Sequence, residues 1–352
     1  MARAVEAAES ARGRTSPNPW VGAVVVPDGA ADGSGPTRAG PGAVFTGATA
    51  PPGGPHAEVT ALAAAGPAAR AGTLYVTLEP CAHQGRTPPC ADAIIAAGIR
   101  RVVVAVEDPD PDVNGRGIAA LRSAGIAVEV GESAHTVRSQ LAPYLKHRRT
   151  GRPWVVLKLA ATLDGGIAAP DGSSRWITGD AARRDAHRLR AQADAVIVGA
   201  GTVRSDDPAL TVRLPLDDPW YRGPDQQPQR VVLGRVPPGA AVEPALEYHG
   251  DLGDVLTRLG GRGMVQVLVE GGSRVAHAFH SARLVDRYVL YLAPALFGGN
   301  DAHPLFAGPG VATVDGLWRG RILSVTSLEG DLRVELSPVA EGEGSGPAPE
   351  IA

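Results

Sequence analysis

The stretch TLYVTLEPCAHQGRTPPCADAIIAAGIRRVVVAVED, residues 73–108, decides the predicted fold of the first half of the chain. It contains a strand pattern at 73–79, a helical pattern at 90–98 and a second strand pattern at 101–108. Strands that alternate with helices in this way indicate a mostly parallel sheet covered by helices. The same stretch holds both cysteines of the 352-residue chain, so its loop needs a chemical explanation as well as a structural one.

The alternation extends on both sides of this stretch. Further helices are expected at 4–12, 56–66 and 117–125, and further strands at 21–26 and 126–131. Residues 27–55 differ, because they are rich in Gly, Pro and Ala and hold only one short apolar piece. For this segment we expect a mobile loop or insertion without a chemical role.

A second α/β series begins after the basic segment 146–153, which has no apolar periodicity. Its strand and helix patterns lie at 154–165, 180–192, 194–202, 229–234, 265–273, 276–284, 286–299 and 332–338. We therefore expect two α/β domains, at 1–146 and 152–340. A polar tail at 341–352 is expected to be disordered, because it has too few apolar residues to pack.

Composition argues against several classes of function. The formal net charge is −3 with 20% charged residues, so no duplex nucleic-acid-binding surface is indicated. The sequence has no run of about 18 apolar residues, and its N-terminal segment lacks the apolar core of a signal peptide. We expect no nucleic-acid or membrane partner and a cytoplasmic location. Since disulfides are uncommon there, the cysteines are better explained as metal ligands or reactive thiols.

Three potential zinc ligands, His56, Cys81 and Cys90, each follow a proline. Because proline is favoured in the first turn of a helix, we expect His56 and Cys90 at helix N-termini and consider the same position for Cys81. Free N–H groups at such a terminus favour a thiolate. Thiolates and a neutral imidazole suit Zn²⁺, and three protein ligands leave one position for water, as in a catalytic site. If His83 supplied a fourth ligand, the site would instead be closed.

Glu58 lies two residues after His56, which on a helix places it on a different face. A carboxylate that does not bind the metal can take a proton from an activated water, as in the H-x-E…P-C-x-x-C signature of zinc-dependent base deaminases. The pattern predicts Glu58 as the catalytic residue of a deaminase, with a structural zinc site as the alternative. The spacing departs from the general signature, because eight residues instead of two separate Cys81 from Cys90.

The segments SPNPWVGAVVV, HAEVTAL, LRSAGI and residues 73–117 together resemble the family of bifunctional riboflavin-biosynthesis deaminase/reductases. The long cysteine spacer with GRTPPC is that family's form of the motif. The resemblance implies a cytidine-deaminase-like three-layer α/β domain that binds Zn²⁺ through His56, Cys81 and Cys90, with Glu58 as the proton shuttle. It also implies a diaminopyrimidinone substrate with a ribosylamino 5′-phosphate, whose exocyclic 2-amino group leaves as ammonia.

Other positions in the first half are candidate substrate contacts with ordinary structural alternatives. Asn18 could hydrogen-bond the ribose or the base, or could simply form a turn. His83 and Arg86 could meet the phosphate or a carbonyl of the substrate, or could be solvated loop residues. Asp108 ends a strand at a turn, and turn chemistry is its alternative role. At Asp110 the family often carries Asn, which weakens the case for a ligand contact there.

Two glycine-rich strand exits stand out in the second half: VLVEGGS at 267–273 and VIVGAGTVRSDDPALTVR at 196–213. No G-x-G-x-x-G follows a strand, so a Rossmann dinucleotide site is not supported. Glycine permits close backbone approach, and the helix expected after 267–273 offers free N–H groups to a phosphate. Each exit alone could also be only a tight turn.

Together with KLAATLDG (158–165), SRWITG (174–179) and LAPALFGG (292–299), these exits resemble the family's reductase domain. The resemblance implies a dihydrofolate-reductase-like α/β fold, NADPH as cofactor, and hydride transfer to C1′ of the ribosylamino group through its ring-opened imine. By motif position, it places Ala160, Trp176, Thr202, Asp206, Gly272, Ser273, Arg274, Val275, Ala276, His277 and Ala278 at the NADPH site. It places Ser174, Arg190, Leu210, Arg213 and Glu270 at the substrate.

Four positions of this second half keep open alternatives. Arg190 and Arg213 suit a bidentate grip on a phosphate. Surface charge is the alternative for both, and without the resemblance it would be the preferred interpretation, because the helical segment that holds Arg190 is also typical of a solvated face. Lys158 could contact the ribosyl hydroxyls or extend its amine to solvent. Arg235 stands where a small hydroxyl residue is expected, and it could meet the 2′-phosphate of NADPH.

The predicted function is two consecutive steps of riboflavin synthesis on a small pyrimidine ribosyl phosphate, with Zn²⁺ and NADPH as cofactors. We expect a homo-oligomer, either a dimer or a tetramer. Three alternatives remain: a deaminase of another base with a non-catalytic second domain, a reductase with a structural zinc domain, and a non-enzymatic nucleic-acid-binding zinc module.

Overall fold

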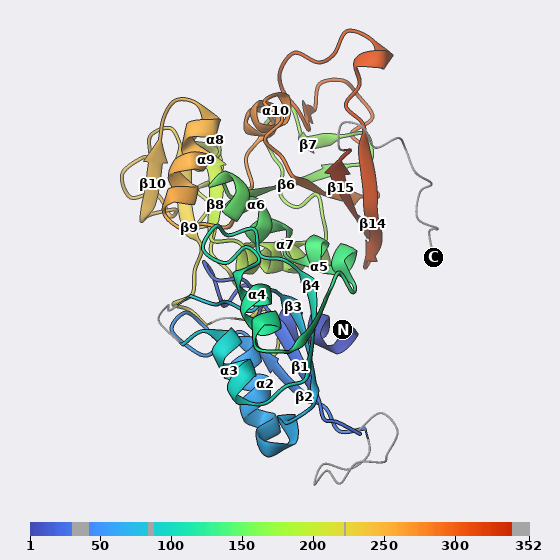
Figure 1. Cartoon of the computed structure of the whole chain (residues 1–352). Coiled ribbons are helices and arrows are strands. Elements are labelled where there is room, and N and C mark those ends of the chain that lie inside the picture. The colour runs from blue at the N-terminus through green and yellow to red at the C-terminus, as the bar shows by residue number, and fades with distance from the viewer. Residues whose placement is uncertain (30–41, 84–87, 222, 340–352) are drawn as a thin grey trace. The chain divides into compact units, whose positions relative to one another are not determined.

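The computed structural model describes residues 1–29, 42–83, 88–221 and 223–339 (Figure 1). The predictions for Arg86 and for the tail at 341–352 lie outside the described residues. The chain divides into two compact units, Met1–Arg152 and Pro153–Ala352. In the described part, no helix is long and apolar enough to cross a membrane.

The first unit is built on a five-stranded sheet with the strand order β2-β1-β3-β4-β5. The strands are β1 (Gly22–Val26), β2 (Phe45–Ala48), β3 (Thr73–Leu78), β4 (Arg101–Val106) and β5 (Ala127–Val130). The helices are α1 (Ala2–Ala11), α2 (Ala57–Ala65), α3 (Cys90–Ala96), α4 (Arg116–Ser123), α5 (Ala134–Gln140) and α6 (Ala142–Thr150), with a short 3₁₀ turn η1 (Gly66–Ala69).

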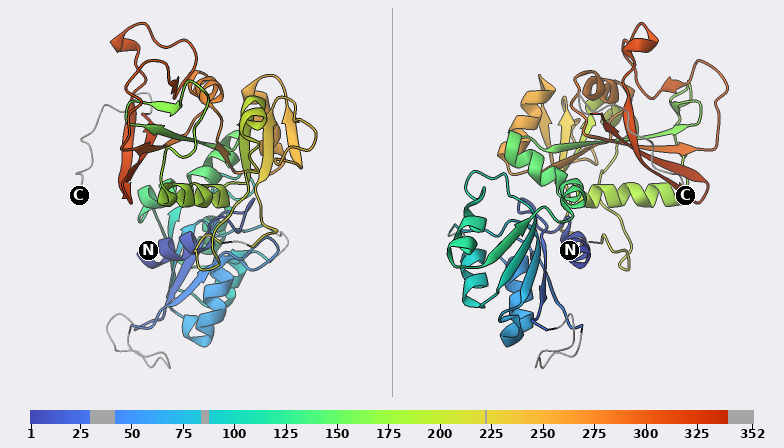
Figure 2. Two further views of the ribbon diagram at one scale, coloured as in Figure 1. Left: turned by 180° about the vertical axis from the view of Figure 1, so that it is seen from behind. Right: turned by 45° about the vertical axis from the view of Figure 1, so that its right-hand side comes forward.

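Two glycines show that helices cover both faces of this sheet (Figure 2). A Cβ on Gly22 would lie 1.9 Å from the Ala4 carbonyl oxygen of α1, and one on Gly47 would lie 2.2 Å from the Ala57 carbonyl oxygen of α2. Gly47 pairs with Ala23, the residue after Gly22, so the two glycines point to opposite faces. Helix α1 therefore packs on one face and α2 on the other, which confirms the predicted three layers.

The sheet is mostly parallel, as predicted: of its described strands β2, β3, β4 and β5 run in one direction, and β1 runs antiparallel to its neighbours β2 and β3. One prediction for the first unit is wrong. The segment 27–55, predicted as a loop, contains β2. This four-residue strand carries little periodic signal of its own, and the ladder of β1 supplies the partner that makes it a strand.

The second unit contains an eight-stranded sheet with the order β10-β9-β8-β11-β6-β12-β15-β14. The strands of this unit are β6 (Trp154–Thr162), β7 (Gly166–Ala168), β8 (Ala195–Gly199), β9 (Gln229–Leu233), β10 (Ala245–Tyr248), β11 (Gln266–Val269), β12 (Arg287–Ala293), β13 (His303–Pro304), β14 (Gly320–Leu328) and β15 (Asp331–Pro338). Its helices are α7 (Asp180–Gln192), α8 (Ala200–Asp206), α9 (Leu252–Gly261) and α10 (Ser273–Ser281), with a 3₁₀ turn η2 (Val314–Gly316).

The first six strands of this order are mutually parallel, and at one edge β15 runs antiparallel to both of its neighbours, β12 and β14. Two apolar clusters fill the two faces of the sheet. One joins α9 and α10 to the sheet through residues such as Leu259 and Phe279, and the other joins α7 and α8 through residues such as Leu189 and Val203. The predicted α/β architecture of the second half is confirmed, although the Gly-rich turn predicted after residue 199 is the helix α8.

Two candidate active sites

The first candidate site is assembled where α2, α3 and the segment after β3 meet. His56 is the N-cap residue of α2, and Cys90 is the first residue of α3. Cys81 lies in the loop three residues beyond β3, so it does not begin a helix. Its sulfur nevertheless accepts a hydrogen bond from the backbone N–H of Cys90, at 3.4 Å. Helix termini thus present two ligand side chains and stabilise the third.

The three side chains form a compact donor set. The Sγ atoms of Cys81 and Cys90 lie 3.7 and 3.2 Å from Nδ1 of His56, and all three ligand atoms are within 4.8 Å of one another. A tetrahedral zinc site with the usual bond lengths separates such atoms by roughly 3.6–3.8 Å. The residues therefore fit Zn²⁺. Among the described residues, this group has three members, and His83 is not one of them.

The electrostatics of the cysteines also favour a cation. The side chain of Cys90 donates a hydrogen bond to Cys81, and together with the backbone N–H it lowers the pKa of the Cys81 thiol to about 4. The same hydrogen bond raises the pKa of Cys90. A divalent ion bound by both sulfurs would displace any proton that remains on the pair.

Glu58 lies in the first turn of α2, is 3% exposed, and lines the same cavity as His56 and Cys81. Burial raises the pKa of this carboxyl to about 7. A carboxyl with a pKa near neutrality can both accept and return a proton. Its position beside the donor set, without belonging to it, is the arrangement that a proton shuttle needs.

A cavity of about 420 Å³ opens onto this donor set. Its lining includes four positions singled out from the sequence: Asn18, His83, Asp108 and Asp110. It also includes Thr49, Pro52, Gly53 and Gly54, all within the segment expected to have no chemical role. The chain from Thr49 to Gly54 therefore returns along the cavity after β2.

Glu79 anchors the far wall of the cavity. This carboxylate is 4% exposed and accepts four backbone hydrogen bonds: Oε1 from Gly117 and Ile118, and Oε2 from Asp108 and Gly115. The bonds fix the loop between β4 and α4. That loop carries three of the lining residues, so Glu79, which also lines the cavity, shapes it through these backbone contacts.

Helix α6 supplies two lining residues that the sequence reasoning missed. The hydroxyl of Tyr144 donates to Asp108, at 2.9 Å to Oδ2, and Nε of Arg148 lies 3.3 Å from Oδ2 of Asp110. The two helix residues are four apart, so they project from one face. The basic residues at 146–153 hide the helical periodicity, so the sequence predicts a domain boundary there instead of the end of α6. A charged residue four positions after an aromatic one is the signal that could have indicated the helix.

The second candidate site lies at the carboxyl ends of β8 and β11, which are adjacent and parallel. Each strand leads into a helix whose N-cap is a glycine, Gly199 for α8 and Gly272 for α10, and neither helix has a side-chain cap. A Cβ on Gly199 would lie 2.8 Å from Cγ2 of Val275, and one on Gly272 would lie 3.4 Å from Oγ1 of Thr202. The glycines therefore let the two uncapped helix starts approach each other, and free N–H groups at the start of α10 suit a cofactor phosphate.

The other predicted cofactor residues fall on several elements of the second unit. Ser273 to Ala278 lie in α10, but Ala276 is fully buried in the core, so only part of this continuous run can face a ligand. Arg274 is exposed, and Nε2 of His277 lies 2.9 Å from the Pro309 carbonyl oxygen.

Four more predicted cofactor positions lie outside α10. Ala160 is on β6, and Asp206 is the last residue of α8. Trp176 is 69% exposed, with the Arg183 guanidinium 4.4 Å from its ring centroid. Arg235 is exposed just after β9, the parallel neighbour of β8.

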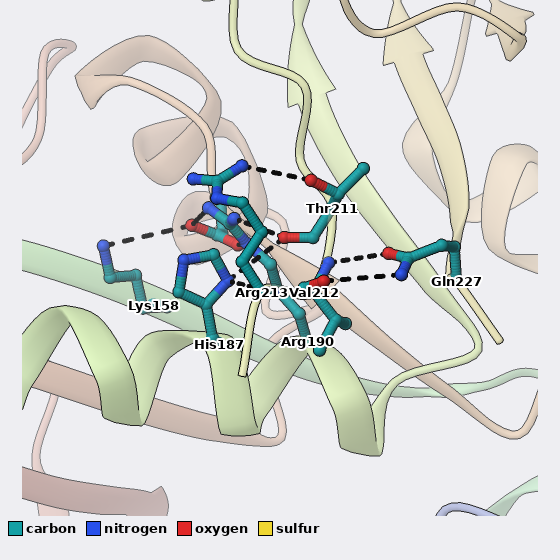
Figure 3. Close-up of polar contacts among 8 residues, drawn as sticks. Lys158, His187, Arg190, Thr211, Val212, Arg213 and Gln227 are labelled. Carbon is teal, nitrogen blue, oxygen red and sulfur yellow. Dashed lines mark hydrogen bonds and ion pairs between the residues drawn. The ribbon is translucent and has the colours of Figure 1, made fainter. Parts of the chain in front are cut away.

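Three of the predicted substrate residues of this unit, Lys158, Arg190 and Glu270, form a charged cluster. In Figure 3, Arg190 projects from α7 and Lys158 points into the same region. Both contact the carboxylate of Glu270. Arg190 is held in a fork by Glu270, with Nη2 3.0 Å from Oε2, and Nη1 also donates to the Thr211 carbonyl at 3.0 Å. Lys158 Nζ is 4.0 Å from Glu270 Oε2 and 5.7 Å from the ring centroid of Tyr291.

Burial and neighbouring charges shift the pKa values of three groups in this cluster. Burial alone would raise the pKa of Glu270, but Arg190 and Lys158 hold it at about 2. Burial lowers the pKa of Lys158, and it also lowers that of His187, to about 4, with help from the neighbouring arginines. The cluster therefore contains a fixed carboxylate, a neutral imidazole and a lysine whose proton is easier to release than usual.

A loop after α8 completes this cluster. In Figure 3, Gln227 forms two hydrogen bonds with the backbone of Val212. Its Oε1 accepts from the Val212 N–H at 2.7 Å, and its Nε2 donates to the Val212 carbonyl at 3.4 Å. Arg213 is exposed, and its Nη1 donates to Oγ1 of Thr211 at 3.0 Å. Ser174 is half-buried in a separate loop, and Leu210 is 4% exposed and packs in the core, which leaves only its backbone for a ligand.

Comparisons with known proteins cover both units. Residues 153–333 match the family "RibD C-terminal domain", and residues 1–106 match "Cytidine and deoxycytidylate deaminase zinc-binding region". The riboflavin biosynthesis protein RibD of Escherichia coli is 41% identical over 347 residues, covering 88% of this chain and 91% of that protein. Its counterpart from Mycobacterium tuberculosis H37Rv is 41% identical over 348 residues, covering 96% of each.

Solved structures agree along the whole length. Acinetobacter baumannii RibD superposes with a TM-score of 0.85 at 36% identity, covering 96% of this chain and 98% of that one. A diaminohydroxyphosphoribosylaminopyrimidine deaminase/5-amino-6-(5-phosphoribosylamino)uracil reductase from Thermotoga maritima gives a TM-score of 0.81 at 35% identity, covering 96% and 97%.

Proposed function

The chain belongs to the RibD family of riboflavin biosynthesis enzymes, and on that premise we propose a reaction for each site. The first unit deaminates 2,5-diamino-6-ribosylamino-4(3H)-pyrimidinone 5′-phosphate by hydrolysis. The second unit then reduces the ribosyl group of the deaminated product to a ribityl group with NADPH. Both products stay on the route to riboflavin.

Deamination in the first unit depends on three ligands and one carboxylate. His56, Cys81 and Cys90 would hold Zn²⁺, which when bound supplies a Lewis acid that lowers the pKa of water. Glu58 then accepts a proton at its carboxylate and returns it to the departing 2-amino nitrogen. Its burial beside the donor set supports this role, because the raised pKa lets the same carboxyl take and give a proton.

The remaining candidates of this cavity would hold the pyrimidinone. Asn18 lines the cavity and makes no side-chain hydrogen bond within the described residues, which leaves its amide for the ribose or the base. His83 lines the exposed side of the same cavity, where it can meet a substrate carbonyl.

Reduction in the second unit depends on positioning. NADPH would supply a hydride, and the N-terminus of α10 with Thr202 would hold one of its phosphates. We assign the other cofactor contacts to Ala160, Trp176, Asp206, Arg235, Gly272 and the exposed side of α10. Ala160 near the end of β6, Gly272 after β11 and Arg235 after β9 support this assignment, because these strands and β8 are parallel neighbours in the sheet.

The charged cluster would orient the ribosyl group. Lys158 hydrogen-bonds the sugar hydroxyls near C1′, and Glu270 holds the Lys158 ammonium in place. Arg190 is already engaged by Glu270, so it acts on the substrate mainly by fixing that carboxylate. Arg213 is exposed, which leaves its guanidinium for the substrate phosphate, with Ser174 and the Leu210 backbone as further contacts.

The observation that carries the first activity is the set of three ligand atoms within 4.8 Å beside a buried Glu58. The test is incubation of the chain with the diaminopyrimidinone riboside 5′-phosphate, with and without NADPH. Ammonia should form in both cases, and NADPH should be oxidised when it is present. Ammonia formation without NADPH oxidation would overturn the reductase assignment.

A substitution separates catalytic from structural zinc. Glu58→Gln keeps the shape of the side chain but cannot shuttle a proton, so ammonia release should fall at least about 100-fold while zinc content stays at one per chain. Reduction of the separately supplied deaminated substrate should be unchanged. A Glu58→Gln protein with full deamination would show that the site is structural.

We also propose a homo-oligomer and a cytoplasmic location. Ile322, Leu323 and Val325 are 39–44% exposed on β14, the edge strand of the large sheet, and a second copy would cover them. Sedimentation at the mass of one 36.1 kDa chain would contradict this. The two thiols are unpaired in the structure, as expected in a reducing compartment, and cell fractionation would test the location.

A further inference from the structure

Among the described residues that line the first cavity, only one guanidinium or ammonium group is available to a phosphorylated substrate. The described lining contains four carboxyl side chains, Glu58, Glu79, Asp108 and Asp110, and a single guanidinium or ammonium group, that of Arg148. A phosphate monoester is a dianion near neutral pH. A cavity dominated by carboxylates repels such a group unless a cation receives it.

Arg148 occupies the outer part of this cavity. Its side chain is 28% exposed, whereas Glu58 beside the donor set is 3% exposed. The guanidinium lies over the Tyr144 ring, 5.1 Å from the centroid, which limits its freedom. The Nε atom is buried, and no hydrogen bond within the described residues satisfies it, although Asp110 Oδ2 is 3.3 Å away. The group is thus held in place with donor capacity to spare.

We propose that Arg148 binds the 5′-phosphate of the substrate during deamination, with Asp110 aligning the guanidinium. The assignment rests on the proposed deaminase function and adds a specificity-determining residue to it. The ring end of the substrate lies at the donor set and the phosphate end at the wall formed by α6. Arginine suits this task, because its planar fork can give two parallel N–H bonds to phosphate oxygens.

Asp110 both helps and opposes this binding. Its Oδ1 accepts from the Asp112 N–H at 3.0 Å, which fixes the carboxylate so that Oδ2 faces Arg148. A fixed carboxylate orients the guanidinium, but its negative charge also weakens the attraction for phosphate. Removing that charge while keeping the shape should therefore strengthen phosphate binding, the opposite of the effect of removing Arg148.

The test compares two substrates, the diaminopyrimidinone riboside with and without its 5′-phosphate, and follows ammonia release. The measured quantity is the ratio of kcat/KM for the phosphorylated form to that for the unphosphorylated form. Arg148→Met should lower this ratio about 10- to 100-fold, mostly through KM, and Arg148→Lys should restore part of it. Arg149→Met is the matched control, since Arg149 is the exposed next residue of the same helix and should leave the ratio unchanged.

Asp110→Asn supplies a result of opposite sign, because it should raise the ratio. Substitution of Arg148 that slows both substrates equally would overturn the assignment and indicate a purely structural residue. A ratio that Arg148→Met leaves unchanged would do the same, as would a ratio that falls in Asp110→Asn. If the unaltered chain released ammonia from neither substrate, the proposed deaminase function itself would fall, and the assignment with it.

Discussion

Glu79→Gln is the substitution whose consequences the structure defines most fully. The carboxylate is 4% exposed and uses both oxygens to accept backbone N–H groups, two on each oxygen. Glutamine offers one acceptor oxygen and turns an NH₂ toward the other pair of donors. Two N–H groups therefore lose their acceptor whichever way the amide is oriented, and at least one of them is buried.

The expected cost follows from this count. Each buried donor left without a partner costs about 1–3 kcal/mol, so the substitution should destabilise the first unit by about 2–6 kcal/mol. Loss of the negative charge at the N-terminus of α4 adds up to about 1 kcal/mol. This sum is a large part of the total stability of an ordinary domain, about 5–15 kcal/mol.

The assay is urea unfolding of the first unit, paired with both activities. The free energy of unfolding should fall by the stated amount, and deamination should fall because the loop between β4 and α4 carries Asp108 and Asp110. Reduction of the separately supplied deaminated substrate should persist. Glu107→Gln is the control, since Glu107 is exposed in the same region. An unfolding free energy within about 0.5 kcal/mol of the unaltered chain would refute the reasoning.

Two further predictions concern the second unit. The pKa of His187 is about 4 in the folded chain and 6.5 when unperturbed, so between these pH values the unfolded chain binds one more proton and stability falls as pH falls. His187→Asn should therefore remove about 1–2 kcal/mol of the loss in unfolding free energy between pH 7 and pH 5, whereas the same substitution at the exposed His249 should not. Gly271→Ala would place a Cβ 2.4 Å from Cβ of Val275, which should shift the start of α10 and raise the KM for NADPH about tenfold. Gly261→Ala is the control, because its Cβ meets nothing within 4 Å and should leave that KM unchanged. Equal KM values for the two variants would contradict the cofactor position.

Local signals made the zinc site predictable from the sequence. Proline before His56 and Cys90 indicates helix starts, and the structure places both residues there. Cys81 is different, because its contact with the start of α3 depends on how the loop folds back, which no neighbour in sequence reveals. The parallel strands were equally predictable, because strands that are buried on both faces appear in the sequence as continuous apolar runs.

Long-range partners explain what the sequence could not predict. The donors to Glu79 lie 29 to 39 residues away, so its role depends entirely on the tertiary fold. Strand β2 needs the ladder of β1, and α6 buries the polar His147 beside apolar residues, which breaks the expected helical pattern. The hydrogen bond from Arg190 to the Thr211 carbonyl likewise joins residues that are 21 positions apart in the sequence.

Helix α6 also determines where the chain can be divided. A protein fragment ending at residue 146, where apolar periodicity is lost, would cut α6 in its middle and remove Arg148 from the deaminase cavity. A fragment ending at Arg152 keeps the whole helix and the compact first unit. A gene fission that separates the two activities must therefore leave the basic segment attached to the deaminase half, as the C-terminus of an independent enzyme.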